Sequence, residues 1–218
     1  RGSSEHAEQY LAYLVMSRLG MIVASLPMSL VTLYGSPLRG KGLLCVALSQ
    51  SGQSPDLEAP TFYLRSGGAR TLAVVNDVRS PLAQAAEFVL PLHAGPELSV
   101  AATKSFIAQL VVAARLVAHW HDQPALHEAL ERLPADLHAA VAADWSSALE
   151  PLRHVDRLFV LGRGPGLAVA QEMALKFKET CGISAEAFSG AEVEHGPIAL
   201  VEQGFAALVL APGGPAQA

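Results

Sequence analysis

The sequence predicts an α/β fold made of two consecutive units, each a parallel β-sheet flanked by helices. Three observations lead to this prediction. Short apolar runs alternate with helical patterns, the alternation restarts after a helical stretch past the middle of the chain, and 51% of the 218 residues are hydrophobic. Strands that alternate with helices favour parallel pairing through right-handed crossovers. The chain ends soon after a predicted strand, so we expect the second unit to be incomplete.

The first unit is predicted over residues 1–122. Its strands are expected where continuous apolar runs occur, at residues 42–48, 71–75 and 88–92. Strands that are buried on both faces have such runs in place of alternating polar and apolar residues. Its helices are expected at residues 56–67, 81–86 and 103–120. The second of these helices has the clearest beginning, since Ser80 is a good N-cap residue and Pro81 suits the first helical position.

Residues 123–152 are predicted to form a helical connection, broken near Pro134, and residues 153–218 a second, partial unit. That unit is expected to contain strands at 157–161 and 206–210, a tight turn at 162–166 and a helix at 167–181. The segment Gly2-Ser3-Ser4 resembles a strand-to-helix turn whose strand is missing. We therefore expect the natural protein to extend beyond this sequence.

Composition argues against several classes of function. The net charge is −5 and the basic residues are scattered, which argues against a nucleic-acid surface. No apolar run approaches the roughly 20 residues that span a bilayer, and no signal-peptide pattern is visible, so we expect a cytoplasmic protein without a membrane partner. Cys45 and Cys181 lack CxxC spacing and are interpreted as small buried residues, with a catalytic thiol or a disulfide as the alternative. His119, His121 and Asp122 end a helix, where histidine suits the helix dipole, and we expect neither a metal nor a cofactor.

The segment Ser49–Ser54 (SQSGQS) follows the first complete predicted strand and opens a helix. Ligands of open α/β sheets bind at the carboxyl ends of strands, and free backbone N–H groups at a helix start favour anions. Hydroxyl groups add donors, and Gly52 would let the backbone approach a ligand closely. The segment therefore predicts an anion site, with a polar loop capped by a serine as the alternative. Residues 2–4 and 99–105 are similar turns before helices, and capping alone would also explain them.

Two further segments offer groups that can move protons. At about 100° per residue, Glu172, Lys176 and Glu179 share one face of the predicted helix at 167–181. An exposed Glu–Lys–Glu ladder is the alternative interpretation. His195 is followed by Gly196 and Pro197 on a constrained loop, and histidine suits proton transfer near neutral pH. A plain surface histidine is the alternative there.

Taken together, these segments resemble the sugar isomerase (SIS) domain family, which includes the isomerase half of glucosamine-6-phosphate synthase. The resemblance covers nearly the whole chain, and its motifs occur in the family's order. The matching segments are residues 49–54, 100–104, 161–164, 174–179 and 185–197.

The resemblance implies tandem SIS units and a homodimer with shared active sites. It implies that the phosphate of an amino-sugar phosphate is held by Ser49, Gln50, Ser51 and Ser54. It further implies sugar contacts from Ser4 and from the backbone near Val100, and a sugar pocket lined by Glu172 and Lys176. Glu179 would move a proton between C1 and C2, and His195 would help to open the ring from the partner subunit. The candidate catalytic residues are therefore Glu179, His195 and Lys176.

The sequence also departs from the family pattern. Ala102 replaces a hydroxyl residue before Thr103, and neither a glutaminase domain nor the C-terminal tail with its catalytic lysine is visible. The resemblance therefore favours a stand-alone deaminase and isomerase that converts glucosamine 6-phosphate to fructose 6-phosphate and ammonia. An isomerase or deglycase for another amino-sugar phosphate is one alternative. A non-catalytic sugar-phosphate-binding regulator is another, although it would not need Glu179 and His195.

Overall fold

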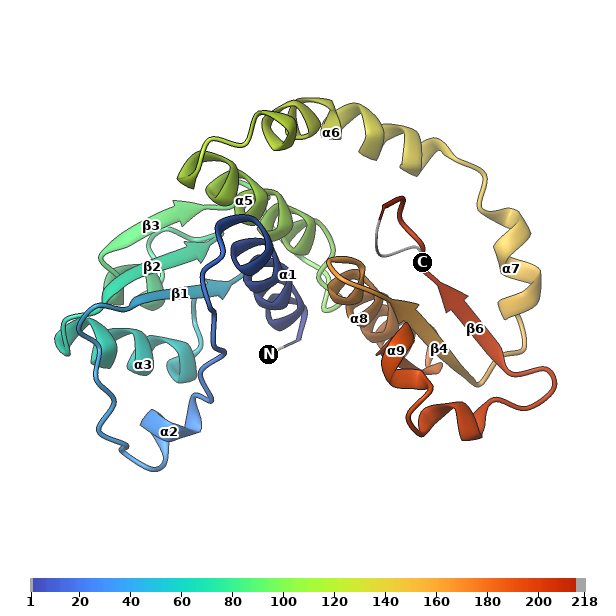
Figure 1. Cartoon of the computed structure of the whole chain (residues 1–218), viewed down its shortest axis with the longest axis horizontal. Coiled ribbons are helices and arrows are strands. Elements are labelled where there is room, and N and C mark those ends of the chain that lie inside the picture. Colours follow the sequence, from blue (N-terminus) through green and yellow to red (C-terminus); the bar gives the residue numbers. More distant parts are fainter. Residues whose placement is uncertain (1, 215–218) are drawn as a thin grey trace.

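The structure is a computed structural model that describes residues 2–214. Within that range the strands form two three-stranded parallel sheets, one in each half of the chain (Figure 1). Helices flank both sheets. The predicted α/β fold with two parallel sheets is therefore confirmed.

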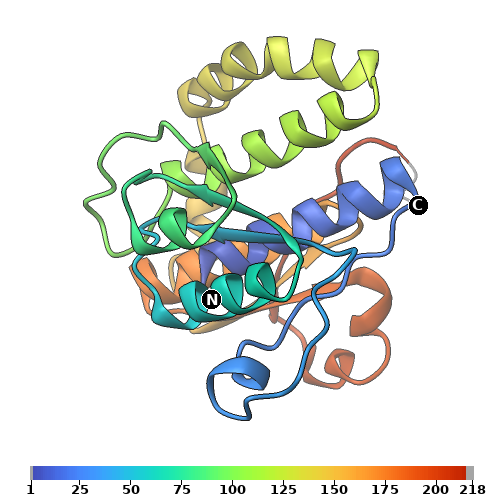
Figure 2. The same ribbon diagram turned by 90° about the vertical axis from the view of Figure 1, so that its left-hand side faces the viewer.

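The first sheet has the strand order β1-β2-β3 and contains β1 (Leu44–Ser49), β2 (Arg70–Val75) and β3 (Phe88–Pro91). Its flanking helices are α1 (Ser3–Leu19), α3 (Pro55–Ser66), α4 (Pro81–Ala85) and α5 (Lys104–Trp120). Side chains alternate between the two faces of a strand. Leu48, Leu72 and Val74 accordingly pack in one core with α1 and α5, whereas Ala73 and Val75 pack with α4 on the other face. Figure 2 shows this half of the molecule toward the viewer.

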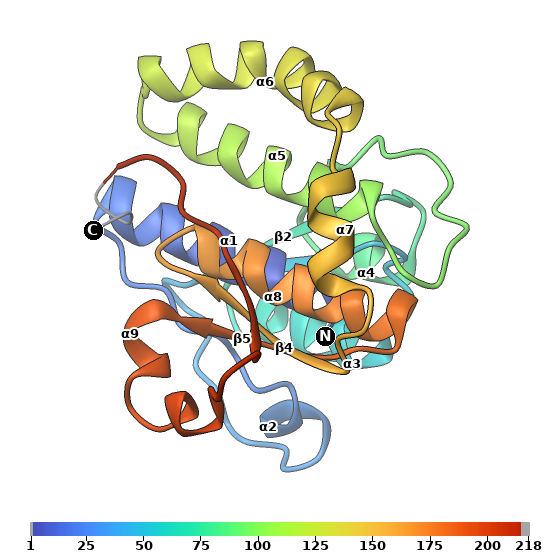
Figure 3. The same cartoon turned by 90° about the vertical axis from the view of Figure 1, so that its right-hand side faces the viewer.

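The second sheet has the order β5-β4-β6 and contains β4 (Arg157–Gly162), β5 (Ser184–Ser189) and β6 (Ala206–Val209). The helix α8 (Gly166–Lys176) covers one face, where Ala170 and Ala174 pack against Leu158 and Val160. The opposite side of α8 contacts α1 (Figures 1 and 3). Two helices, α1 from the first unit and α8 from the second, thus pack against each other at the centre of the molecule.

The connection between the sheets consists of α6 (Pro124–Ala142) and α7 (Ser146–Leu152). The predicted break at Pro134 is wrong, because α6 runs through this residue and ends eight residues later, at Ala142. Pro134 is exposed, so water can satisfy the carbonyl group that loses its helical partner.

Several local predictions are confirmed and others need correction. Ser80 caps α4, since its hydroxyl accepts a hydrogen bond from the Ala83 N–H. The predicted burial of both cysteines is wrong for Cys181, which is exposed, and only partly correct for Cys45. The first strand is buried only toward its C-terminal end, because Leu44 is 41% exposed.

The remaining short elements lie at the periphery. They are α2 (Ser29–Thr32), α9 (Gly190–Val193) and a 3₁₀ turn (Pro197–Leu200). In the part of the chain that the structure describes, none of the helices combines the length and the apolar character needed to cross a membrane.

Candidate functional site

A cavity of about 270 Å³ lies where the two units meet. The start of α1 contributes Ser3 and Ser4, and the turn after β1 contributes Ser49, Gln50 and Ser51. The loop before α5 adds Val100 and Ala102, and α5 itself adds Ser105 and Gln109. The second unit contributes Glu179. The predicted anion-binding turn and the predicted proton-moving carboxylate, 128 residues apart from Ser51 to Glu179 in the sequence, therefore line the same cavity.

The turn after β1 is held by its own serine hydroxyls. Ser49 Oγ accepts a hydrogen bond from the Gly52 N–H at 3.0 Å, and Ser51 Oγ accepts one from the Gln53 N–H at 3.3 Å. A hydroxyl that accepts in this way keeps its own proton for donation. Ser49 and Ser51 can therefore donate hydrogen bonds to an anion in the cavity.

Gly52 has a different role from the one expected. Its φ of +65° is unusual for residues with a side chain, and a Cβ atom at this position would overlap the buried Ser80. Gly52 does not line the cavity. It allows the turn to pack closely against α4 rather than against a ligand.

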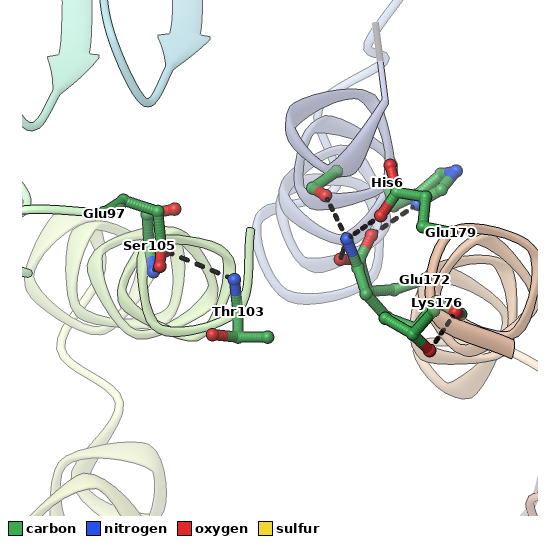
Figure 4. A network of polar contacts seen from close by, with 9 residues as sticks. His6, Glu97, Thr103, Ser105, Glu172, Lys176 and Glu179 are labelled. Atoms are coloured by element: carbon green, nitrogen blue, oxygen red, sulfur yellow. Dashed lines mark hydrogen bonds and ion pairs between the residues drawn. The ribbon is translucent and has the colours of Figure 1, made fainter. Parts of the chain in front are cut away.

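The loop before α5 also differs from expectation. The N–H groups of Thr103 and Ser105 both donate to Oε2 of Glu97, at 3.2 and 2.8 Å (Figure 4). Thr103 makes no side-chain cap. These backbone donors are already used by a carboxylate of the chain itself, so they are not available to a bound anion. The contribution of this loop to the cavity comes instead from Val100, Ala102 and Ser105.

The predicted Glu–Lys–Glu face is not a solvated ladder. The ammonium group of Lys176 lies 3.3 Å from Oε1 of Glu172 and 2.6 Å from Oε2 of Glu179 (Figure 4). Lys176 also donates to Ser3 Oγ at 3.4 Å, and His6 Nδ1 lies 2.9 Å from Oε2 of Glu172. Glu172 is only 5% exposed. The network joins α8 to α1 and continues to Glu179 in a π-helical turn (Phe177–Cys181), an irregularity often found at functional sites.

Opposing effects act on the pKa of Glu172. Burial raises the pKa of this carboxyl group. Hydrogen bonds from His6 and Ser3, together with the charge and hydrogen bond of Lys176, lower the pKa by a larger amount. The net pKa lies below the ordinary value of 4.5. Glu172 is therefore a carboxylate at neutral pH, and His6 must donate its Nδ1 proton to it, because a carboxylate only accepts.

This lowered pKa predicts a pH dependence of stability. A carboxyl group with a lower pKa in the folded state contributes stability that is complete above its unfolded pKa and is lost as the pH falls through the folded pKa. We expect the difference in free energy of unfolding between the wild type and Glu172→Gln to shrink as the pH falls from about 5 to about 3. Urea denaturation at each pH measures it. A difference that stays constant over this range would contradict the assignment.

Some predicted site residues lie outside the cavity. Ser54 stands at the N-cap position of α3 and does not line it. Glu172 and Lys176 lie behind Glu179 in the network rather than on the cavity wall. His195 is exposed on the loop after α9 and does not line this cavity. Its predicted arrival from a partner subunit stays a prediction.

Two polar residues near the site, Gln109 and His6, were not predicted, and Ser3 was predicted only as part of the turn at residues 2–4. Gln109 is 1% exposed, and its Nε2 donates to Ser4 Oγ at 2.9 Å. A glutamine inside the apolar run of α5 was the available signal, because a buried polar side chain requires partners. The contacts of Ser3 and His6 with α8 gave no comparable signal, since both residues lie in a polar first turn and their partners are more than 160 residues away. Within residues 2–214, no group of three or more His, Cys, Asp or Glu side chains is arranged to hold a metal ion.

Comparison with known proteins places this architecture. The family model described as SIS domain matches residues 1–118 and 151–217. This chain belongs to the SIS domain family. Residues 119–150, which include α6, lie between the two matched parts of the SIS chain.

Curated relatives of this SIS chain include two glutamine–fructose-6-phosphate aminotransferases (isomerizing). The protein from Zymomonas mobilis is 38% identical over 196 residues, and that from Symbiobacterium thermophilum is 38% identical over 221 residues. The matches cover 84% and 96% of this chain but 32% and 36% of the relatives. The SIS chain thus spans about a third of their length.

Solved structures agree with the assignment to the family. A candidate phosphosugar isomerase from Silicibacter pomeroyi DSS-3 is 46% identical, with a TM-score of 0.95 over 100% of this chain and 66% of its own. The C-terminal domain of glucosamine-fructose-6-phosphate aminotransferase from Francisella tularensis is 26% identical, with a TM-score of 0.85 over 100% of this chain and 64% of its own.

Proposed function

We propose that this chain forms the catalytic part of a phosphosugar isomerase that converts glucosamine 6-phosphate and water into fructose 6-phosphate and ammonia. The observation that carries the proposal is the shared cavity, in which the Ser49–Ser51 turn faces the same space as Glu179. Its volume of about 270 Å³ is close to the lower end of small-molecule sites, about 300 Å³. A phosphate at one end and a base at the other would hold a sugar between them.

The reaction follows from these groups. The hydroxyls of Ser49 and Ser51 bind the phosphate, which orients C1 and C2 of the opened sugar at the Glu179 carboxylate. Glu179 takes the proton from C2 and leaves an enolamine, and a proton returned to C1 gives the imine of fructose 6-phosphate. Water then adds at C2, the C–N bond breaks and ammonia leaves. Lys176 holds the Glu179 carboxylate in place through its contact with Oε2.

The remaining predicted residues contact the sugar, complete the phosphate site or open the sugar ring. Ser4 and the backbone near Val100, which line the cavity, contact the sugar. Glu172 supports this region through Lys176, and Gln50, which lines the cavity, completes the phosphate site. Ser54 lies outside the cavity wall at the N-cap of α3, so its predicted phosphate contact stays a prediction. His195 opens the sugar ring from the partner subunit of a cytoplasmic homodimer, and its exposure on a loop supports such a role.

A second candidate is an isomerase for a different phosphosugar. The similarity to the candidate phosphosugar isomerase of Silicibacter pomeroyi DSS-3 favours it, at 46% identity. Both candidates use the same turn and the same carboxylate, and they differ only in whether the substrate carries an amine at C2. A regulatory module that only binds sugar phosphates would not need Glu179 in the cavity, so this residue favours an enzyme.

The test uses the full-length protein with glucosamine 6-phosphate, and ammonia and fructose 6-phosphate are measured together. The proposal predicts that both products form in equal amounts. Interconversion of an aldose and a ketose phosphate without ammonia would support the second candidate instead. No turnover of any phosphosugar in a panel of amino and neutral hexose phosphates would contradict both.

Replacing Ser51 by alanine tests the phosphate site. A hydrogen bond to a charged group contributes about 1.5–3 kcal/mol, so we expect KM to rise about 10- to 100-fold. We expect kcat to change little, because phosphate binding is the same in the ground and transition states. Steady-state kinetics measure both. Ser147→Ala, at an exposed position of α7, is the matched control and should leave both constants unchanged. A fall in kcat at unchanged KM for Ser51→Ala would contradict the assignment.

A further inference from the structure

Among the histidines that the structure describes, His6 is the one with a hydrogen bond to the network of Glu172, Lys176 and Glu179. The network belongs to the second unit, whereas His6 belongs to the first. It lies in the first turns of α1, three residues after Ser3, so both side chains share the face of α1 that contacts α8. Ser3 accepts a hydrogen bond from Lys176, and His6 binds Glu172. Two neighbouring residues of α8 are thus held by two neighbouring residues of α1.

The ammonium group of Lys176 contacts two carboxylates at unequal distances. Its ammonium group lies 2.6 Å from Oε2 of Glu179 but 3.3 Å from Oε1 of Glu172. The other oxygen of Glu172 is occupied by His6 Nδ1 at 2.9 Å. The side chain of Glu172 is 7% exposed and that of His6 is 17% exposed, so water has little access to this bond.

The consequence of losing the His6 donor follows from burial. A buried carboxylate oxygen without a donor is costly. Without His6, the remaining donors to Glu172 are Ser3, which already binds it, and Lys176. Glu172 would turn both oxygens toward Lys176 and draw the ammonium group away from Glu179. Glu179 would then lose the contact that fixes its carboxylate on the cavity wall.

We propose that His6 is a positioning residue: its hydrogen bond to Glu172 leaves Lys176 free to hold Glu179 for proton transfer on the phosphosugar. This inference rests on the proposed function. His6 does not line the cavity, so it would act only through Glu172 and Lys176. The catalytic geometry in the second unit would therefore depend on a side chain of the first.

The test compares His6→Ala, His6→Asn and the wild type, all in the full-length protein. A misplaced catalytic group costs up to about 100-fold, so we expect His6→Ala to lower kcat about 10- to 100-fold. KM should stay within about threefold, because the phosphate turn is separate from the network. His6→Asn should restore most of kcat, since its side-chain amide can donate to Glu172 from nearly the position of Nδ1. Ser17→Ala, which removes another side-chain hydrogen bond on α1, should leave kcat unchanged.

Two further variants test whether His6 acts through Glu172. In a Glu172→Gln background, His6→Ala should cause little additional loss of kcat, because both changes break the same link. If His6→Ala does not fold, His6→Leu fills the volume without supplying a donor, and the same outcomes apply to it.

The outcomes also separate this inference from the proposed function. Activity of the wild type with unchanged kcat in His6→Ala would overturn the role of His6 alone. Equal losses in His6→Ala and His6→Asn, or additive losses with Glu172→Gln, would overturn it as well. Absence of phosphosugar turnover by the wild type would instead refute the proposed function on which the inference rests.

Discussion

Replacing Glu179 by glutamine is expected to lower kcat for phosphosugar turnover by about 10²- to 10⁴-fold, the usual contribution of a general base. The amide has nearly the same shape as the carboxylate but cannot take a proton from C2. Binding of the phosphosugar should stay within about threefold of wild type, because the serine turn that holds the phosphate is unchanged. Steady-state kinetics and calorimetric titration with the substrate measure the two effects.

Glu128→Gln is the matched control for Glu179→Gln. Glu128 makes an exposed ion pair with Arg132 on α6, away from the cavity residues, so its replacement should leave kcat and binding unchanged. Survival of activity in Glu179→Gln would show that another group moves the proton. Loss of activity together with loss of binding would place Glu179 in substrate recognition instead.

Replacing Gly52 by alanine is expected to destabilise the protein by about 2–5 kcal/mol, from the cost of a side chain in a left-handed conformation and from overpacking. The added Cβ atom would lie 2.5 Å from Ser80 Cβ, and Ser80 is 1% exposed and caps α4. The turn would have to move, and with it Ser49 and Ser51. Chemical denaturation measures the stability, and the KM for phosphosugar should rise at the same time.

Gly42→Ala separates the two causes of this destabilisation. Gly42 has a φ of +84°, but no atom within 4 Å would meet a Cβ atom there. Its replacement should cost only about 1–2 kcal/mol, the conformational part alone, and leave KM unchanged. If Gly52→Ala costs no more than Gly42→Ala, the close packing of the turn against Ser80 does not matter for stability.

The parts of the fold that the sequence predicts are those with strong local signals. The strand at β2 follows from a continuous apolar run, and α4 follows from the Ser80–Pro81 start. The strand β5 was not predicted, because every residue of Ser184–Ser189 except Phe188 is small or polar, and the segment becomes a strand by pairing with β4. The helix break expected at Pro134 was wrong although the local signal was strong. The rule that proline interrupts a helix does not hold at this exposed position, where α6 continues.

The candidate site, like the fold, was predicted from the sequence only in part. Helical periodicity placed Glu172, Lys176 and Glu179 together, and their contacts confirm that they are neighbours. Periodicity could not reveal their partner on α1, because the bond between His6 and Glu172 joins residues 166 positions apart. Nor could it show that Glu97 already uses the backbone donors before α5. The bond between His6 and Glu172 depends on how the two units pack, and the Glu97 contacts depend on how the loop before α5 folds back on itself. Helical periodicity encodes neither.

The fate of the proton at C2 of glucosamine 6-phosphate tests the central claim most directly. Proton NMR can follow this signal together with ammonia release in the wild type and in Glu179→Gln. The proposed mechanism predicts that the wild type removes the C2 proton as ammonia appears, whereas Glu179→Gln binds the substrate and leaves the proton in place. Loss of the C2 proton at the wild-type rate in Glu179→Gln, or ammonia release with the proton retained at C2, would contradict it.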